Sequence, residues 1–375
     1  MTRARVLIAA IVLVAAIASF ALRVSTSMAD FEVYWRGAVR AAAAEPLYRA
    51  DDGHFQFKYL PAFAVLTIPL GFLSLPVAKA VWFALSIALL SVLVWLSVEL
   101  LPARQKSKGL LIAIVILVLG KFFAHELELG QVNILFAVLA AAALLAMKHG
   151  GETLAGVLIA FTIAIKPYGV LFVPWLIARR KGASLLSFCL VSVVIAMLPV
   201  GIYGLDGTTA LNRAWWNTVR ETTPANLANP DNVSFAGMWV KWLGAGALAT
   251  TLTAFTALGA LAAAALAYLR RRGLAFPEAL EGSLLLLLVP LLSPQGWDYV
   301  LLLAAPAVAL LANDADRLPP WLRATTIVAA LTMGLSLFDV MGRRAYGVFM
   351  GLAVISICAS VLITALCALR VQKVA

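Results

Sequence analysis

The sequence predicts an all-α protein that crosses a membrane several times, and three observations lead to this fold class. Of its 375 residues, 63% are apolar and only 13% are charged, whereas soluble domains are about 45–50% apolar and about 25% charged. The apolar residues form runs long enough to cross a bilayer. The net charge of +11 comes from short basic clusters between these runs, which is typical of membrane topology rather than of a nucleic-acid-binding face. We therefore expect a single transmembrane domain over residues 1–375, with membrane lipids and no nucleic acid as partners.

A transmembrane helix needs about 20 apolar residues. This criterion predicts spans at 6–24, 78–101, 110–124, 132–147, 184–203, 244–269, 321–340 and 346–369. Shorter apolar runs lie at 60–75, 153–165, 168–178, 280–293 and 299–312. The first run follows two arginines, as in a signal peptide, but Arg23 lies at its end and no clear small-residue cleavage site is present. These features favour a retained span.

The basic clusters set the orientation, because lysine and arginine concentrate on the cytoplasmic side. Almost all of them can be cytoplasmic together if run 60–75, which contains Pro61 and Pro69, lies at the outer face without crossing. Arg343 and Arg344 are then the exception. This topology predicts about twelve crossings, cytoplasmic N- and C-termini, and two long outer loops at about 25–59 and 204–243. Eleven of the 18 acidic residues fall outside, which suggests an exoplasmic active site.

Asp30 begins an amphipathic helix in the first outer loop. Phe31, Trp35 and Val39 share one face of this helix, which we expect to point toward lipid, and Pro46 ends it. Asp30 would be its N-cap, a position where aspartate stabilises a helix by about 1 kcal/mol. A capped carboxylate is also rigid and ionised, as a general base must be. Both roles remain open from the residues alone.

Two lysines lie at the expected outer surface. Lys58 sits where the chain re-enters the interface, and Lys166 precedes Pro167 within an apolar stretch. Either side chain can anchor the protein at lipid headgroup depth. Either can also bind the phosphate of a lipid-linked substrate, and Lys166 can alternatively pair with Glu126 or Glu128.

The turn at 125–133 is unusually polar for a connection between two spans. It begins with His125, but four residues later comes Leu129, so the zinc-binding pattern HExxH is absent and no metal is expected. Gln131 and Asn133 provide hydrogen-bond donors and acceptors that suit sugar hydroxyls, although they can also cap the next helix. We expect a site here that includes Glu126 and Glu128.

The outer loop at 204–243 contains adjacent tryptophans, Trp215 and Trp216. Tryptophan stacks on sugar faces, and it also anchors proteins at the membrane interface. We expect this long loop to cover the site and to help select the acceptor.

Several ordered motifs resemble glycosyltransferase family 87. They are Asp30-Phe31-x-Val33-Tyr34-Trp35, Pro46-Leu47-Tyr48, Tyr59-x-Pro61, Gly130-Gln131-Val132-Asn133, Ala155-Gly156, Ala164-Ile165-Lys166-Pro167 and Ser293-Pro294-x-x-Trp297. The resemblance implies a GT-C-type fold and transfer of a sugar from a polyprenyl phosphate to an acceptor hydroxyl. Because the family includes a mycobacterial mannosyltransferase of phosphatidylinositol mannoside synthesis, mannose is the expected sugar. The resemblance also implies a catalytic role for Asp30.

The resemblance further implies a histidine directly after the Ser-Pro-x-x-Trp motif, but this chain has Asp298 and Tyr299 there. Asp298 replaces that histidine in part, or His125 or His54 takes its role from another loop. We expect His125, Lys58 and Lys166 to contact the donor phosphate, and Trp297 and Asp298 to contact sugar.

Together these features predict an inverting glycosyltransferase of the bacterial plasma membrane. Its substrates would be a polyprenyl-phosphate-linked sugar and a lipid or glycan acceptor, and it would need no cofactor because phosphate is already a good leaving group. The alternative is a flippase or transporter for lipid-linked sugars. A transporter would place its charged residues near the membrane midplane, in two matching repeats.

Overall fold

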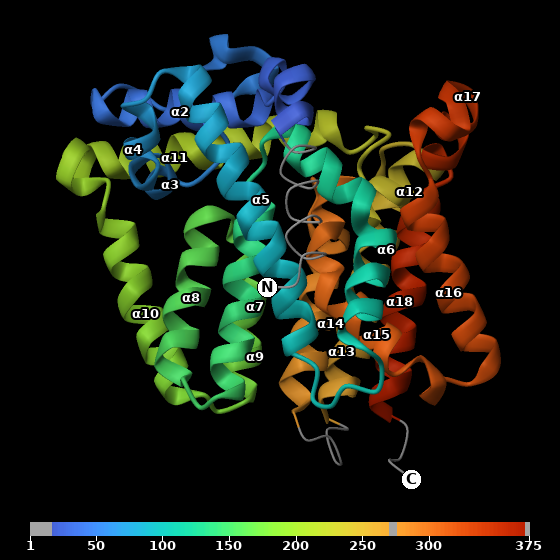
Figure 1. Ribbon diagram of the computed structural model, residues 1–375. Helices are drawn as coiled ribbons and strands as arrows, with labels where there is room; N and C mark the ends of the chain where they lie inside the picture. Colours follow the sequence, from blue (N-terminus) through green and yellow to red (C-terminus); the bar gives the residue numbers. More distant parts are fainter. Residues whose placement is uncertain (1–16, 270–275, 372–375) are drawn as a thin grey trace.

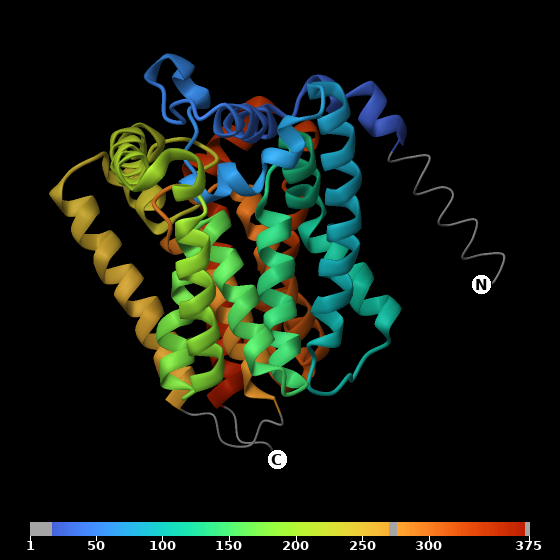
Figure 2. The same cartoon turned by 90° about the vertical axis from the view of Figure 1, so that its left-hand side faces the viewer.

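The computed structural model describes residues 17–269 and 276–371, which form two layers of helices (Figure 1). Long helices stand side by side as a bundle, and a second set of helices lies across one end of it (Figures 1 and 2). We call this second set the cap. Within the described residues the only β-type pairing is an isolated bridge between Asn232 and Trp297, so the predicted all-α class is confirmed.

The bundle contains α5 (Leu75–Glu99), α6 (Lys108–Leu129), α7 (Asn133–Lys148), α8 (Glu152–Ile165), η3 (Pro167–Leu171), α9 (Phe172–Ala178), α10 (Gly182–Met197), α13 (Ala247–Leu269), α14 (Pro277–Leu292), η4 (Asp298–Ala304), α15 (Ala305–Asn313), α16 (Pro320–Leu335) and α18 (Val354–Val371). The cap contains η1 (Val24–Thr26), α2 (Ala29–Ala42), η2 (Ala50–Phe55), α3 (Pro61–Leu66), α4 (Ile68–Gly71), α11 (Val200–Asn226), α12 (Phe235–Leu243) and α17 (Phe338–Gly351). A short turn, η5 (Ala315–Arg317), lies at the opposite end of the bundle.

Four described helices, α5, α6, α13 and α18, are long and apolar enough to cross a membrane. Two bent pairs, α10 with α11 and α16 with α17, raise this number to six if each pair counts as one span. The predicted twelve crossings are therefore not confirmed, because α7, α8 and the other apolar helices are shorter than the length that spans the hydrocarbon. The predicted span at 6–24 falls mostly outside the described residues.

The centre of the bundle is formed by α14, η4 and α15, whose residues are almost all buried. Their sequence explains this position, because a helix that is apolar on every side has no face suited to water. Pro290 and the Ser293-Pro294 pair interrupt the regular hydrogen bonding here, and the chain continues as the 3₁₀ segment η4. This break brings Asp298 to the cap end of the bundle.

Small residues allow the helices to approach closely, as expected where the surroundings are lipid. At Gly156 of α8, a Cβ atom would lie 2.0 Å from the carbonyl oxygen of Ser184 and 2.1 Å from Ser187 Oγ on α10. The Ser187 hydroxyl also donates to the Thr153 carbonyl at 2.9 Å. Glycine is therefore required at this crossing.

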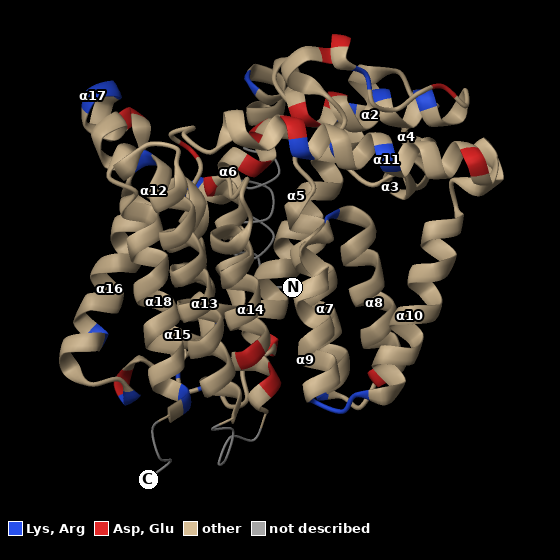
Figure 3. Ribbon diagram, turned by 180° about the vertical axis from the view of Figure 1, so that it is seen from behind, with Lys and Arg blue, Asp and Glu red and all other residues tan. Residues whose placement is uncertain are grey.

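Charged residues lie at the two ends of the bundle, and its middle is almost free of them (Figure 3). The end opposite the cap holds ion pairs such as Lys106 with Asp316 and Lys181 with Glu152. The α16–α17 bend of 107° carries Arg343 and Arg344 to the cap end (Figure 3). These two arginines thus lie apart from the other described basic clusters, as the sequence predicts.

Three local predictions are wrong. Residues 204–243 are not an irregular loop, because α11 and α12 occupy most of that range. Run 346–369 does not form one span, because its first residues belong to α17 in the cap. The aromatic face of α2 does not point to lipid: Phe31 is fully buried and stacks on Trp82, with ring centroids 5.5 Å apart.

The crossing of α8 and α10 provides a stability test. Gly156→Ala should destabilise the protein by about 1–3 kcal/mol, because the new methyl group forces the two helices apart. The apparent melting temperature in detergent should fall by several degrees. Gly120→Ala on α6 is the control, because its Cβ would enter open space, and an equal loss there would contradict the packing argument.

Candidate functional site

The amide of Gln131 is the centre of a buried polar cluster beneath the cap. Its Nε2 donates to Asp30 Oδ2 at 2.7 Å and lies 3.3 Å from the Tyr299 hydroxyl. Its Oε1 accepts from the hydroxyls of Tyr34 at 2.7 Å and Tyr59 at 3.3 Å. The cluster thus unites α2, the segment before α3, the α6–α7 turn and η4.

Gly130 gives Gln131 this position. It ends α6 in the left-handed conformation with φ at 68°, which favours glycine. A Cβ atom here would lie 2.7 Å from Phe31 Cβ, so α2 packs directly on the turn. The Gly130 carbonyl also accepts from the indole of Trp82 at 2.8 Å. The turn is therefore held by α2 and by α5.

Asp30 is not the N-cap of α2. The capping position belongs to Met28, whose φ is 55°, and the helix begins at Ala29. Asp30 instead turns its carboxylate to Gln131. Burial raises the pKa of the Asp30 carboxyl, while the Gln131 hydrogen bond and the nearby charges of Lys166, Lys58 and His125 act in the opposite direction.

Lys166 is the buried cation of the cluster. It has an extended backbone between α8 and η3, as expected for a residue before proline. Its Nζ donates to Asn133 Oδ1 at 2.7 Å and lies 3.4 Å from Gln131 Oε1. Asn133 in turn donates to Glu126 Oε2 at 2.8 Å. The sequence-predicted residues Gln131, Asn133, Glu126 and Lys166 are thus brought together with Asp30.

Glu126 is fully buried and has a structural task. Besides Asn133, its carboxylate accepts from the backbone N–H of Ile134 at 3.0 Å. It therefore fixes the first turn of α7 and orients the Asn133 amide toward Lys166. This geometry argues against the sugar contact that the sequence suggests for Glu126.

Lys58 approaches Asp30 from the segment between η2 and α3. Burial lowers the pKa of the Lys58 amine, and the charge of Asp30 opposes that shift. Within the described part of the chain, its Nζ makes no hydrogen bond. Its carbonyl oxygen accepts from the Trp215 indole at 3.1 Å, so α11 positions Lys58 through the backbone.

His125 and Asp298 form a pair beside the Asp30 cluster. His125 Nδ1 lies 3.0 Å from Asp298 Oδ1, and the imidazole packs edge-on against Tyr299 with centroids 5.1 Å apart. Within the described residues, no three His, Cys, Asp or Glu side chains form a group that could hold a metal ion.

Several sequence-predicted residues do not join the cluster. Glu128 pairs with Arg23 at 3.1 Å, Trp216 is 59% exposed, and Trp215 donates to Lys58 as described. Trp297 is partly buried and packs against the hydrophobic core.

Sequence reasoning missed the site tyrosines as functional residues. Tyr34 and Tyr59 are hydrogen-bonded to each other at 2.8 Å, and the Lys166 amine lies 5.7 Å from the Tyr59 ring centroid. The available signal was the position of tyrosines within otherwise apolar motifs, since a buried hydroxyl usually has a polar partner.

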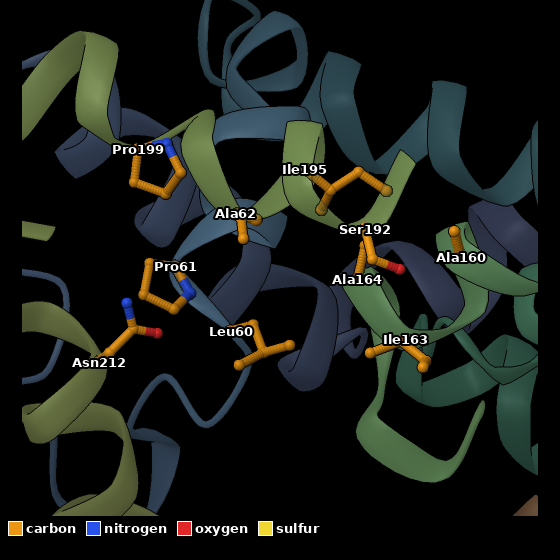
Figure 4. A pocket seen from close by; sticks show the side chains of 11 residues that line it. Leu60, Pro61, Ala62, Ala160, Ile163, Ala164, Ser192, Ile195, Pro199 and Asn212 are labelled. Carbon is orange, nitrogen blue, oxygen red and sulfur yellow. The ribbon is translucent and has the colours of Figure 1, made fainter. Parts of the chain in front are cut away.

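An apolar pocket of about 120 Å³ lies between the cap and the bundle. It is lined from α3, α8, α10 and the start of α11, and Figure 4 shows the side chains of its lining. Leu60 and Pro61 follow Lys58 closely in the chain, and Ala164 precedes Lys166 by two residues. The pocket lining thus includes near neighbours in sequence of both lysines, although neither lysine lines it.

A family model described as glycosyltransferase family 87 matches residues 57–294, which is more than half of the chain. The matched region contains Lys58, Gln131 and Lys166, while Asp30 and Asp298 flank it. No curated protein and no solved structure matches the chain. The helical membrane fold agrees with this match, and the chain belongs to glycosyltransferase family 87.

Proposed function

We propose that this membrane glycosyltransferase moves a sugar, with mannose favoured, from a polyprenyl phosphate to a hydroxyl of a lipid or glycan acceptor. The observation that supports it best is the Asp30 carboxylate, which lies close to the amines of Lys58 and Lys166 beside an apolar pocket. A base, cations for a phosphate and an apolar groove are the groups that such a transfer requires.

Asp30 serves as the general base in this proposal. It removes the proton of the acceptor hydroxyl while that oxygen attacks the anomeric carbon of the donor sugar. The bond from this carbon to the phosphate oxygen breaks, and its electron pair leaves with the phosphate. Direct attack inverts the anomeric centre. The Gln131 hydrogen bond holds the carboxylate in one orientation, which proton transfer requires.

Lys58 and Lys166 bind the donor phosphate. The Lys58 amine makes no hydrogen bond within the described residues, and Lys166 uses two donors on Asn133 and Gln131, so each amine retains a proton for a phosphate oxygen. Their positive charge stabilises the charge that grows on the leaving phosphate.

The first units of the polyprenyl chain lie in the apolar pocket, and the rest of the chain extends from it into the lipid. Pocket residues such as Pro61, Ile163 and Ala164 offer it only apolar surface. The donor phosphate then reaches the lysines without its chain leaving the bilayer.

The reaction takes place at the exoplasmic face of the bacterial plasma membrane. The short turns opposite the cap contain clusters of basic residues, such as Arg104, Lys106 and Lys108 where α5 connects to α6 and Arg179, Arg180 and Lys181 between α9 and α10, and by the positive-inside rule that end is cytoplasmic. The last described residues, at the end of α18, lie at that end (Figure 1), and we infer that both the C-terminus and the N-terminus are cytoplasmic. A transporter is disfavoured because the cluster lies at one end of the bundle rather than at a midplane site.

Replacing Asp30 tests the base. Asp30→Asn should reduce kcat by about 10²–10⁴-fold, because the amide cannot accept the hydroxyl proton. Transfer from radiolabelled polyprenyl phosphomannose by the purified variant measures this. Asp51→Asn, at an exposed carboxylate of the cap, should keep wild-type turnover. A folded Asp30→Asn protein with near wild-type turnover would contradict the assignment.

The pH dependence provides a second test. Because burial raises the Asp30 pKa and the base acts when deprotonated, kcat should rise with pH through a range above the ordinary aspartate value of about 3.9. Gln131→Met removes a hydrogen bond that lowers this pKa, so the rising limb should move to higher pH. A limb that stays in place would show that another group titrates.

The phosphate contact is tested at Lys166. Lys166→Met should raise the donor KM by about 10–100-fold, the loss expected for one charge-assisted hydrogen bond. Lys106→Met, at the opposite end of the bundle, is the control and should change nothing. An unchanged donor KM and kcat in Lys166→Met would indicate that Lys166 serves only as a buried structural cation.

A further inference from the structure

The pair of His125 and Asp298 has an orientation that limits what it can bind. Asp298 is nearly closed off, with 3% of its side chain exposed, whereas 35% of the His125 side chain is exposed. The same carboxylate oxygen that meets His125 Nδ1 also accepts from the backbone N–H of Tyr299 at 2.7 Å. Since no other hydrogen bond to His125 occurs in the described part of the chain, its Nε2 remains available to a ligand.

This imidazole belongs to the same site as Asp30. Its ring contacts Tyr299, the Tyr299 hydroxyl lies 3.3 Å from Gln131 Nε2, and that atom donates to Asp30. Asp30 is thus close to two different kinds of group: the amines of Lys58 and Lys166, and the imidazole of His125.

The surroundings of His125 are negatively charged. The segment after α11 is joined to the segment before η4 by two backbone hydrogen bonds, from Asp298 to Asp231 at 2.9 Å and from Val233 to Gly296 at 2.6 Å. These bonds bring the Asp231 carboxylate close enough to Asp298 for the two charges to interact. His125 is therefore near two carboxylates.

Of the two lysines nearby, Lys241 is fully occupied by protein oxygens and Lys121 is partly occupied. The Lys241 amine donates to the carbonyls of Pro230 and Asn232, both at 2.7 Å, and of Met350 at 3.2 Å. An ammonium has only three protons, so none remains for a ligand. The Lys121 amine donates two of its three protons to Ser336, to the hydroxyl at 2.9 Å and to the carbonyl at 3.0 Å. The part of the site around His125 thus offers a ligand fewer free ammonium protons than the part around Lys58, whose amine makes no hydrogen bond within the described residues.

We infer that His125 binds a hydroxyl group of the acceptor, and that Asp298 is a positioning residue that keeps the imidazole turned with Nε2 toward the substrate. The inference rests on the proposed glycosyl transfer. A phosphate at His125 would face two carboxylates and be repelled, whereas a neutral hydroxyl can donate to or accept from Nε2. This assignment replaces the phosphate contact for His125, and the sugar contact for Asp298, that the sequence suggests.

Binding of undecaprenyl phosphate, in the absence of any acceptor, tests whether His125 contacts the donor phosphate. Titration of the purified full chain in detergent, followed by tryptophan fluorescence, should give His125→Ala a Kd within twofold of wild type. Lys166→Met should weaken binding at least tenfold. A loss in His125→Ala as large as that in Lys166→Met would overturn the inference.

Kinetics with polyprenyl phosphomannose and octyl α-mannoside test the acceptor contact. His125→Ala should raise the acceptor KM at least tenfold and leave the donor KM within twofold, and His125→Gln should recover part of the loss. His149→Ala, an exposed histidine at the far end of α7, is the matched control. A rise confined to the donor KM would overturn the inference, whereas no transfer by the wild-type protein from any donor would contradict the proposed function.

The positioning role of Asp298 is tested by the tautomer of His125. The chain has only three histidines, so the imidazole ¹⁵N signals of His125 can be assigned from their loss in His125→Ala. Asp298→Ala should abolish the preference for a proton on Nδ1 and raise the acceptor KM, and Asp298→Asn, which keeps an accepting oxygen, should restore part of both. An unchanged tautomer and acceptor KM in folded Asp298→Ala would overturn this role.

Discussion

The site depends on one neutral group, the Gln131 amide, placed between charges of opposite sign. Its nitrogen donates to Asp30 and its oxygen faces Lys166. A carboxylate and an ammonium in direct contact would neutralise each other, and neither would be free for a substrate. An amide satisfies both without a charge of its own. In the proposed mechanism Asp30 thus keeps the ability to accept a proton and Lys166 the ability to bind an anion, although both are buried.

This arrangement also explains why the cap is rigid where it meets the bundle. Gln131 has a fixed position because Gly130 ends α6, and α2 packs on that turn through Phe31. Lys79 of α5 holds the same helix from the other side, by an ion pair with Glu32 at 2.7 Å and a hydrogen bond to the Ser27 carbonyl. The same contacts between α2 and the α6–α7 turn thus hold the cap on the bundle and position the buried polar cluster.

Much of the site could be predicted from residue types, but its connections could not. Asp30, Gln131 and Lys166 are recognisable because a polar residue in an apolar sequence is costly to bury unless it has a polar partner or a function. The hydrogen bond between Asp30 and Gln131 joins residues 101 positions apart, and no local spacing contains that information. The capping role expected for Asp30 fails because Met28 adopts a left-handed conformation set by the tertiary fold. Helix α11 escaped prediction because it contains Gly204 and Pro224 and mixes polar with aromatic residues.

The elbow of 90° between α10 and α11 decides from where the donor can arrive. Beyond the elbow, α11 runs across the cap end, and its Asn212 helps to line the apolar pocket, so α11 covers the pocket from the cap side. Under the proposed function, a lipid-linked donor that binds there is recruited by diffusion within one leaflet. Its effective concentration is then a mole fraction among lipids, and the enzyme's rate follows the composition of the membrane rather than the volume of the compartment outside it.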